Sequence, residues 1–307
     1  MDQFHDGHHV RLRNLVQRTY LHAADDGVGV TLHERRASMN AAWAVHICHG
    51  GDGDGDGDGH RLLLHSAAYG RYLAAGARPA RLGHRGLRAE LSDYDLPEVE
   101  AIMWRAVGSG FDFEDDVVLL RHVGGRYLRA NGKYLPWNSS GVSVDDDDDA
   151  SPMMYWVVEP IPLREAGMPA IPGPLPTRPR CLSPIFGSPG RRILFVGALE
   201  NGFYPEEVDG WRLFLFKERS VFRLRDDLAF RVAAGVDDPN IVMCVRAGRY
   251  GRLTPLVVDL PHGGYGETLE IVVFLAGTPG SNSGKSNLVS ARYILLEHGC
   301  NPVEELK

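Results

Sequence analysis

The chain has 307 residues, of which 44% are hydrophobic and 24% charged, the balance of an ordinary soluble globular protein of about two domains. Its net charge of −7 is uneven, because residues 1–160 carry 16 Lys+Arg against 24 Asp+Glu (16 − 24 = −8). This acidic balance lacks the basic footprint of a nucleic-acid-binding protein and argues against attraction to a membrane surface.

Four cysteines lie far apart in the sequence, without a C-x-x-C pair: Cys48, Cys181, Cys244 and Cys300. This spacing predicts reduced, mostly buried thiols, with neither a zinc site nor a disulfide framework. The N-terminus has no basic segment followed by an apolar one, and no apolar run approaches the roughly 20 residues that span a bilayer. We therefore expect a cytoplasmic protein without a signal peptide or a membrane segment.

The first half of the chain contains three similar units. A Tyr-Leu pair follows a short apolar run at Tyr20, Tyr72 and Tyr127, at spacings of 72 − 20 = 52 and 127 − 72 = 55 residues. A tryptophan closes each unit: Trp43, Trp104 and Trp156. A repeat of this period marks one supersecondary unit that must stack with its neighbours to bury its apolar face.

Each unit is expected to contain about four short strands bounded by turn residues. The expected strands are 10–15, 18–23, 28–32 and 43–47; then 61–65, 71–74, a short strand near Arg81 and 103–107; then 117–122, 126–129, 141–144 and 155–158. Twelve strands in three units predict an all-β fold, a β-trefoil over residues 1–160. The Tyr-Leu pairs are expected to supply apolar side chains to the barrel, and the three Trp to pack at equivalent core positions. A β-sandwich or part of a propeller is the alternative. Residues 1–9 are interpreted as a loose lead-in, and the Gly-Asp run at 50–59 and the Asp run at 145–149 as solvated loops.

A second domain is predicted beyond the trefoil. Residues 161–190 are Pro-rich and are interpreted as a linker. Residues 191–277 predict an α+β, ubiquitin-like ββαββ roll, with strands 191–199, 211–217, 241–246, 253–258 and 269–275. Its helix is expected from Val221 to about Ala234, with Ser220 as its cap. Residues 278–307 form a polar tail in which a short helix is expected.

The segment Gly124–Trp137, GGRYLRANGKYLPW, resembles a motif of a large plant family of uncharacterised proteins with a fascin-like, actin-cross-linking type of trefoil. The opening strands and Asn40-Ala41-Ala42-Trp43 resemble the first unit of that family. The region 190–276 resembles the ubiquitin-like domain of many members. The resemblance implies both folds and, by fold analogy alone, an association with actin. It implies no catalytic residue and no cofactor.

One stretch of the second unit is basic, with no acidic residue between Arg71 and Glu90: Arg71, Arg78, Arg81, His84, Arg85 and Arg88. It is either a solvated loop or a surface for an acidic protein such as actin, or for another anionic ligand. Arginine suits the second role because its planar fork binds carboxylate or phosphate through two hydrogen bonds. Tyr134, Trp137 and Asn138 form an aromatic and polar cluster that suggests a glycan platform, or else a structural plug.

The remaining motifs do not complete a site. The Asp52, Asp54 and Asp56 spacing resembles a calcium loop, but its twelfth position is Leu63 instead of glutamate. The stretch 279–286 resembles a phosphate-binding loop whose first glycine is displaced by one residue. The histidines near Cys48 and the N-terminus lack metal-site spacing, and no nucleophile motif occurs. We therefore expect a non-enzymatic binding or scaffold protein without a cofactor, of unknown oligomeric state, with a lectin-like trefoil as the alternative.

Overall fold

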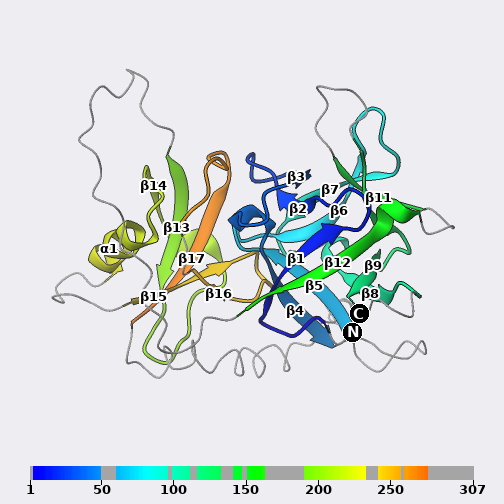
Figure 1. Ribbon diagram of the computed structural model, residues 1–307. Helices are drawn as coiled ribbons and strands as arrows, with labels where there is room; N and C mark the ends of the chain where they lie inside the picture. The colour runs from blue at the N-terminus through cyan, green and yellow to red at the C-terminus, as the bar shows by residue number, and fades with distance from the viewer. Residues whose placement is uncertain are drawn as a thin grey trace, which may run out of the picture.

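The computed structural model describes residues 3–49, 60–95, 99–110, 116–132, 141–146, 151–162, 190–232, 241–256 and 259–275. Figure 1 shows two β-rich domains side by side. In the described residues, one domain has a twelve-stranded sheet and the other a five-stranded sheet with one α-helix. The Gly-Asp run at 50–59, the tail at 278–307 and nearly all of the predicted linker at 161–190 lie outside the described residues.

Six strands of the first domain close into a barrel. They are β1 (His9–Asn14), β4 (Trp43–His49), β5 (His60–Ser66), β8 (Trp104–Gly108), β9 (Val117–His122) and β12 (Tyr155–Ile161). Each strand pairs antiparallel with the next in that order, and β12 pairs back onto β1. Closure satisfies the backbone groups that an open sheet would leave at its edges.

Three hairpins cap one end of the barrel. They are β2 (Tyr20–Ala23) with β3 (Val30–His33), β6 (Tyr72–Pro79) with β7 (Leu87–Ser92), and β10 (Tyr127–Ala130) with β11 (Val142–Asp145). Strand β11 pairs with β7. Two single bridges join the β2–β3 hairpin to the other two hairpins, Gly29 to Glu90 and Thr31 to Gly141. The arrangement confirms the predicted β-trefoil. The strand expected near Arg81 is wrong, because Gly83 and Gly86 adopt positive φ angles (86° and 77°) and turn the chain there.

The three units share one core in the way the repeat predicts. All three tryptophans and the leucines of the three Tyr-Leu pairs are fully buried. Each indole N–H donates to the leucine carbonyl of its own unit: Trp43 to Leu21 at 3.1 Å, Trp104 to Leu73 at 2.9 Å and Trp156 to Leu128 at 3.0 Å. A short 3-10 helix ends just before each tryptophan: Met39–Ala41, Val99–Ile102 and Pro152–Met154. The pseudo-threefold symmetry of the core therefore includes these three equivalent hydrogen bonds.

The N-terminal residues are not the loose lead-in that their polarity predicts. Phe4 is 6% exposed and belongs to the trefoil core. The Asp6 carboxylate accepts a hydrogen bond from the N–H of Ile47 (2.9 Å), and the Gly7 N–H donates to the Val45 carbonyl (2.8 Å). These contacts fasten the chain to β4 before β1 begins.

The second domain is a mixed five-stranded sheet with α1 (Val221–Val232) against one face. The strand order is β14-β13-β17-β15-β16. The strands are β13 (Arg191–Gly197), β14 (Arg212–Phe216), β15 (Ile241–Arg246), β16 (Thr254–Pro255) and β17 (Thr268–Leu275). The parallel pairing of β13 with β17 completes the predicted ubiquitin-like roll.

Alternation along the strands gives this sheet two apolar faces. The α1 side holds the larger core, which includes Ile193, Phe195, Phe216, Leu224, Leu228, Met243 and Val273. The opposite face carries a smaller cluster: Trp211, Cys244, Val272 and Phe274, with Leu194 and Val196 partly buried beside them. The sheet therefore needs cover on both faces, and the β13–β14 connection with Trp211 supplies part of it on the second.

Helix α1 is capped differently from the sequence prediction. The Ser220 hydroxyl is buried and forms no hydrogen bond within the described residues. Instead, the Asp259 carboxylate accepts the first helical N–H, that of Val221, at 2.9 Å. A carboxylate at a helix N-terminus also complements the helix dipole. A side chain 38 residues away in sequence thus supplies the cap.

Candidate functional site

The two domains meet where the turn after β15 contacts the segment after β7. The Tyr94 N–H donates to the Ala247 carbonyl (2.8 Å), and the Tyr250 N–H donates back to the Tyr94 carbonyl (3.0 Å). The Arg249 N–H donates to the Asp95 carboxylate at 2.5 Å. Backbone polar groups of each domain thus find their hydrogen-bond partners on the other domain.

Glycines make this close approach possible at two places. Gly248 has a φ of 81°, and a Cβ there would lie 2.8 Å from the Tyr94 nitrogen. Gly70 has a φ of 66°, and a Cβ there would overlap the side chain of Val245 on the other domain. Both positions combine a left-handed backbone with no room for a side chain, so only glycine suits them.

A series of polar contacts also crosses the junction between the domains. Arg252 donates two parallel hydrogen bonds to Asp6, from Nη1 to Oδ1 at 2.7 Å and from Nη2 to Oδ2 at 2.9 Å. The Arg252 backbone N–H donates to the Tyr72 hydroxyl oxygen (3.2 Å), which lies 2.9 Å from Nδ1 of His46. Burial lowers the pKa of His46 well below its usual value and raises the pKa of Tyr72, so both side chains are neutral.

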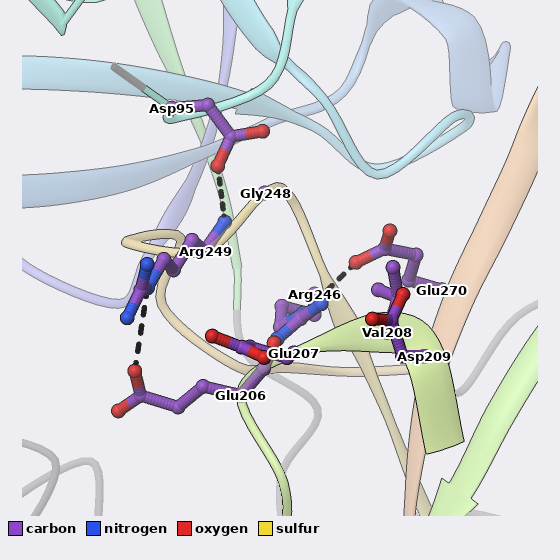
Figure 2. A pocket seen from close by; sticks show the side chains of 9 residues that line it. All are labelled: Asp95, Glu206, Glu207, Val208, Asp209, Arg246, Gly248, Arg249 and Glu270. Carbon is purple, nitrogen blue, oxygen red and sulfur yellow. Dashed lines mark hydrogen bonds and ion pairs between the residues drawn. The ribbon is translucent and has the colours of Figure 1, made fainter. Parts of the chain in front are cut away.

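A pocket of about 350 Å³ opens beside this contact (Figure 2). Its lining comes from both domains: Asp95, Glu206, Glu207, Val208, Asp209, Arg246, Gly248, Arg249 and Glu270. Asp95 is the trefoil contribution, and the other residues come from the β13–β14 connection, the β15 end and β17. The ubiquitin-like domain therefore forms most of the pocket, and the trefoil adds one carboxylate to it.

Arg246 forms the inner wall of the pocket and is 4% exposed. Its Nε donates to Glu270 at 2.8 Å, its Nη1 donates to the Glu206 carbonyl at 2.6 Å, and its guanidinium lies 4.3 Å from the Trp211 ring centroid. These bonds hold the guanidinium against the wall. We therefore assign Arg246 a structural role, because its guanidinium is engaged by groups of the protein itself.

The remaining lining is acidic. Five carboxylates face two guanidiniums, a formal balance of 2 − 5 = −3. Such a lining favours a cationic group, an amine or a guanidinium, over an anion. Within the described residues, no group of three His, Cys, Asp or Glu side chains is arranged to hold a metal ion. Neither of the described cysteines, Cys48 and Cys244, forms a disulfide within the described residues, and burial raises the pKa of Cys244 to about 12.

The structure divides the predicted basic surface into three parts. Arg71 lies at the domain junction, where it pairs with Asp93 (3.2 Å) and with Glu267 of the ubiquitin-like domain (2.5 Å). His84 and Arg88 are half-buried, and burial lowers the pKa of His84. Only part of the set is therefore offered to solvent.

The exposed part lies on the β6–β7 hairpin, whose turn projects from the trefoil (Figure 1). Arg78, Arg81 and Arg85 are exposed, and Leu82 at the tip is 90% exposed. Arg78 pairs with Glu90 at 2.7 Å. We call Arg78, Arg81, Leu82 and Arg85 the basic hairpin.

The acidic run that neighbours this hairpin is partly neutralised by other arginines. Asp145 pairs with Arg129 (3.2 Å) and Asp146 with Arg126 (2.5 Å). The rest of the run, residues 147–149, lies outside the described residues, as do Tyr134, Trp137 and Asn138, the calcium-like run at 52–58 and the phosphate-loop-like segment at 279–286.

The junction is the functional feature that sequence reasoning missed. Its one local signal is the stretch Ala247–Arg252, AGRYGR, where two glycines flank a tyrosine at the end of a strand. Glycines there indicate a turn, but not the surface that the turn meets.

Comparison with protein families identifies both halves of the chain. The beta-trefoil domain of unknown function (DUF569) matches residues 1–159, and the DUF569 associated ubiquitin-like domain matches residues 189–274. The chain belongs to the DUF569 family. The DUF569 match confirms the two predicted folds, whereas the fascin-like type of trefoil and the plant origin stay predictions.

Among solved structures, this DUF569 chain is similar to a Caenorhabditis elegans protein of unknown function (19% identity, 51% of this chain and 96% of that chain, TM-score 0.41). It is similar to the SDF2-like protein of Arabidopsis thaliana (19%, 52% and 98%, 0.41) and to the Macrolepiota procera ricin B-like lectin in complex with lactose (14%, 50% and 96%, 0.38). A comparison with curated proteins found no match. In the described part of the chain, no helix is long and apolar enough to cross a membrane.

Proposed function

We propose that this DUF569 protein is a non-enzymatic binding or scaffold protein whose trefoil presents the basic hairpin to an acidic protein surface. The observation that carries the proposal is the exposure of Arg78, Arg81 and Arg85 around an apolar tip, Leu82, which is 90% exposed. An apolar residue ringed by arginines suits a partner that offers carboxylates around a shallow apolar depression.

The actin filament is the specific partner proposed, since it is an acidic protein surface and the fascin-like resemblance points to it by fold analogy. The docked domains support a scaffold role because they hold the hairpin and the ubiquitin-like sheet in one orientation. Two partners bound at these surfaces would be held at a set distance.

Co-sedimentation with actin filaments over a salt series tests this proposal. Wild-type protein should pellet saturably, and pelleting should weaken as salt screens the arginines. The triple variant Arg78/Arg81/Arg85→Glu should stay in the supernatant. A matched triple variant, Arg18/Arg35/Arg121→Glu, makes the same charge change at other exposed trefoil positions and should pellet like wild type.

Pelleting that is absent at low salt, or lost equally in both triple variants, would contradict the actin proposal. The lectin-like alternative is then tested on a glycan array with the Trp137→Ala variant, whose loss of a wild-type signal would favour a glycan site at Tyr134, Trp137 and Asn138.

A further inference from the structure

Strand β14 is the edge of the ubiquitin-like sheet. It pairs with β13 on one side, and no strand of the described residues pairs with the other side. Its sequence, RLFLF from Arg212 to Phe216, contains neither proline nor glycine, and its register with β13 is regular. Natural edge strands are usually blocked by prolines, bulges or a covering element. The β14 edge lacks the first two devices, and no backbone hydrogen bond from the described residues fills its outer side.

The face of β14 that points away from α1 is apolar and exposed. Leu213 is 60% exposed and Leu215 is 62% exposed. Leu213 lies directly opposite Leu194 on β13, which belongs to the apolar cluster on that face. Two large exposed side chains on one short edge strand therefore extend an apolar surface that the sheet already holds.

Two arginines lie over the aromatic side chains on the α1 side of this edge. The Arg212 guanidinium lies 4.7 Å from the Phe195 ring centroid, and that of Arg231 lies 4.3 Å from the Phe214 ring centroid. Within the described residues neither arginine forms an ion pair, even though Asp227 precedes Arg231 by one helical turn. Figure 1 shows α1 beside β14. Arg212 belongs to β14 and Arg231 lies over Phe214 of β14, so both guanidiniums are at this strand.

We propose that the β14 edge binds an extended segment of a partner protein in which apolar residues alternate with Asp or Glu. Successive side chains of an added strand point to opposite faces of the sheet. Its apolar residues would contact Leu213 and Leu215 while its carboxylates meet Arg212 and Arg231. This surface is on the domain opposite the basic hairpin and is independent of the proposed actin contact.

Charge argues against a second copy of this chain as the occupant. Antiparallel pairing of two β14 strands about Phe214 would bring Arg212 and Arg231 of both copies to one face. Four guanidiniums gathered there would repel one another. An acidic segment removes that repulsion and satisfies the same backbone groups.

Fluorescence anisotropy with a labelled synthetic peptide of alternating Val and Glu, titrated with the full chain, tests the proposal. The Arg212/Arg231→Glu variant should raise the dissociation constant at least about tenfold. The matched variant Arg223/Arg225→Glu changes the same charge on exposed positions of α1 and should bind like wild type. A peptide of the same composition with its Val and Glu residues in separate blocks should bind much more weakly. Amide hydrogen exchange of residues 212–216 should slow when the alternating peptide is added.

Several results would overturn the proposal. One is the lack of wild-type binding up to about 1 mM chain, an affinity too weak for a docking site. Others are equal binding of the alternating and block peptides, equal losses in the two double variants, or unchanged exchange in β14. A concentration-dependent dimer that excludes the peptide would assign the edge to a second copy and reject the acidic partner.

Discussion

The indole N–H of Trp104 donates a 2.9 Å hydrogen bond to the carbonyl of Leu73, across 31 residues of sequence. Both residues are fully buried, and the bond ties the last strand of the second unit to its hairpin. Trp43 and Trp156 make the same bond in their own units. In each unit, the same hydrogen bond therefore joins the two motifs that recur in the sequence, the Tyr-Leu pair and the tryptophan.

Replacing Trp104 with Phe should destabilise the trefoil by about 2–4 kcal/mol, because it leaves a buried carbonyl without a donor and opens a cavity. Trp43→Phe and Trp156→Phe should cost similar amounts, since the three sites are equivalent. Urea unfolding followed by circular dichroism measures the change.

The matched control is Trp211→Phe in the ubiquitin-like domain, where the indole donates to the Pro205 carbonyl at 3.0 Å. Because this hydrogen bond is only partly buried, the replacement should cost less than any of the three in the trefoil. A near-zero cost at one of the three trefoil sites would contradict their equivalence.

The pseudo-threefold core was predictable because the sequence signals for it are local and occur three times. Tyr-Leu pairs and single tryptophans recur at similar spacings, and apolar residues with that period must meet in one core. The predicted strand bounds were wrong where the backbone conformation of glycines determines where a strand begins. Near Arg81 the glycines at positions 83 and 86 reverse the chain, so the strand begins at Leu87 instead.

The domain junction was not predictable, because its bonds join residues far apart in sequence. Asp95 and Arg249 are separated by 154 positions, and Asp6 and Arg252 by 246. No periodicity or motif links such pairs. Polarity misled at the N-terminus for the same reason, since the partners of Asp6 are Ile47 and Arg252, both far from it in sequence. The free β14 edge is likewise a property of the whole sheet.

Gly248→Ala should separate the two domains. The substitution strains a φ of 81° by about 1–2 kcal/mol and drives a Cβ to 2.8 Å from the Tyr94 nitrogen. We expect one thermal unfolding transition to split into two, and limited proteolysis to cut between the domains. Gly210→Ala is the control, because a Cβ there meets nothing within 4 Å and its effect should stay within about 0.5 kcal/mol. A single transition in the Gly248→Ala variant would show that docking does not depend on this approach.

The Asp6–Arg252 pair should contribute to docking through its two hydrogen bonds of 2.7 and 2.9 Å. The Asp6 and Arg252 side chains are 27% and 13% exposed, so solvent screens the pair only partly. A double-mutant cycle of Asp6→Asn and Arg252→Gln should give a coupling free energy of about 1–3 kcal/mol. The double-mutant cycle cancels the effect that Asp6→Asn has on the hydrogen bond from the Ile47 N–H, because that effect is the same with and without Arg252. A coupling below about 0.3 kcal/mol would mean that the pair is incidental.

Acid should destabilise the fold through its buried histidines. Burial lowers the pKa of His65 to about 3 and that of His46 well below its usual value, and the two rings stack with centroids 5.4 Å apart. Both are neutral in the folded state, whereas the unfolded chain binds protons below its histidine pKa of about 6.5. Above about pH 6.5 the two histidines are neutral in both states and do not reduce the free energy of unfolding. Below that pH the unfolded chain binds protons first, so the free energy of unfolding falls until the pH reaches the folded pKa values. Each contributes a slope of about 1.4 kcal/mol per pH unit.

Urea midpoints at pH about 7.5 and about 5 measure this slope. The double variant His46/His65→Gln should be less stable at the higher pH and should lose less between the two, because glutamine takes up no proton. The control is His5→Gln, whose ring is exposed and whose variant should keep the wild-type slope. If the double variant kept that slope as well, other groups would cause the acid sensitivity and the buried pair would carry none of it.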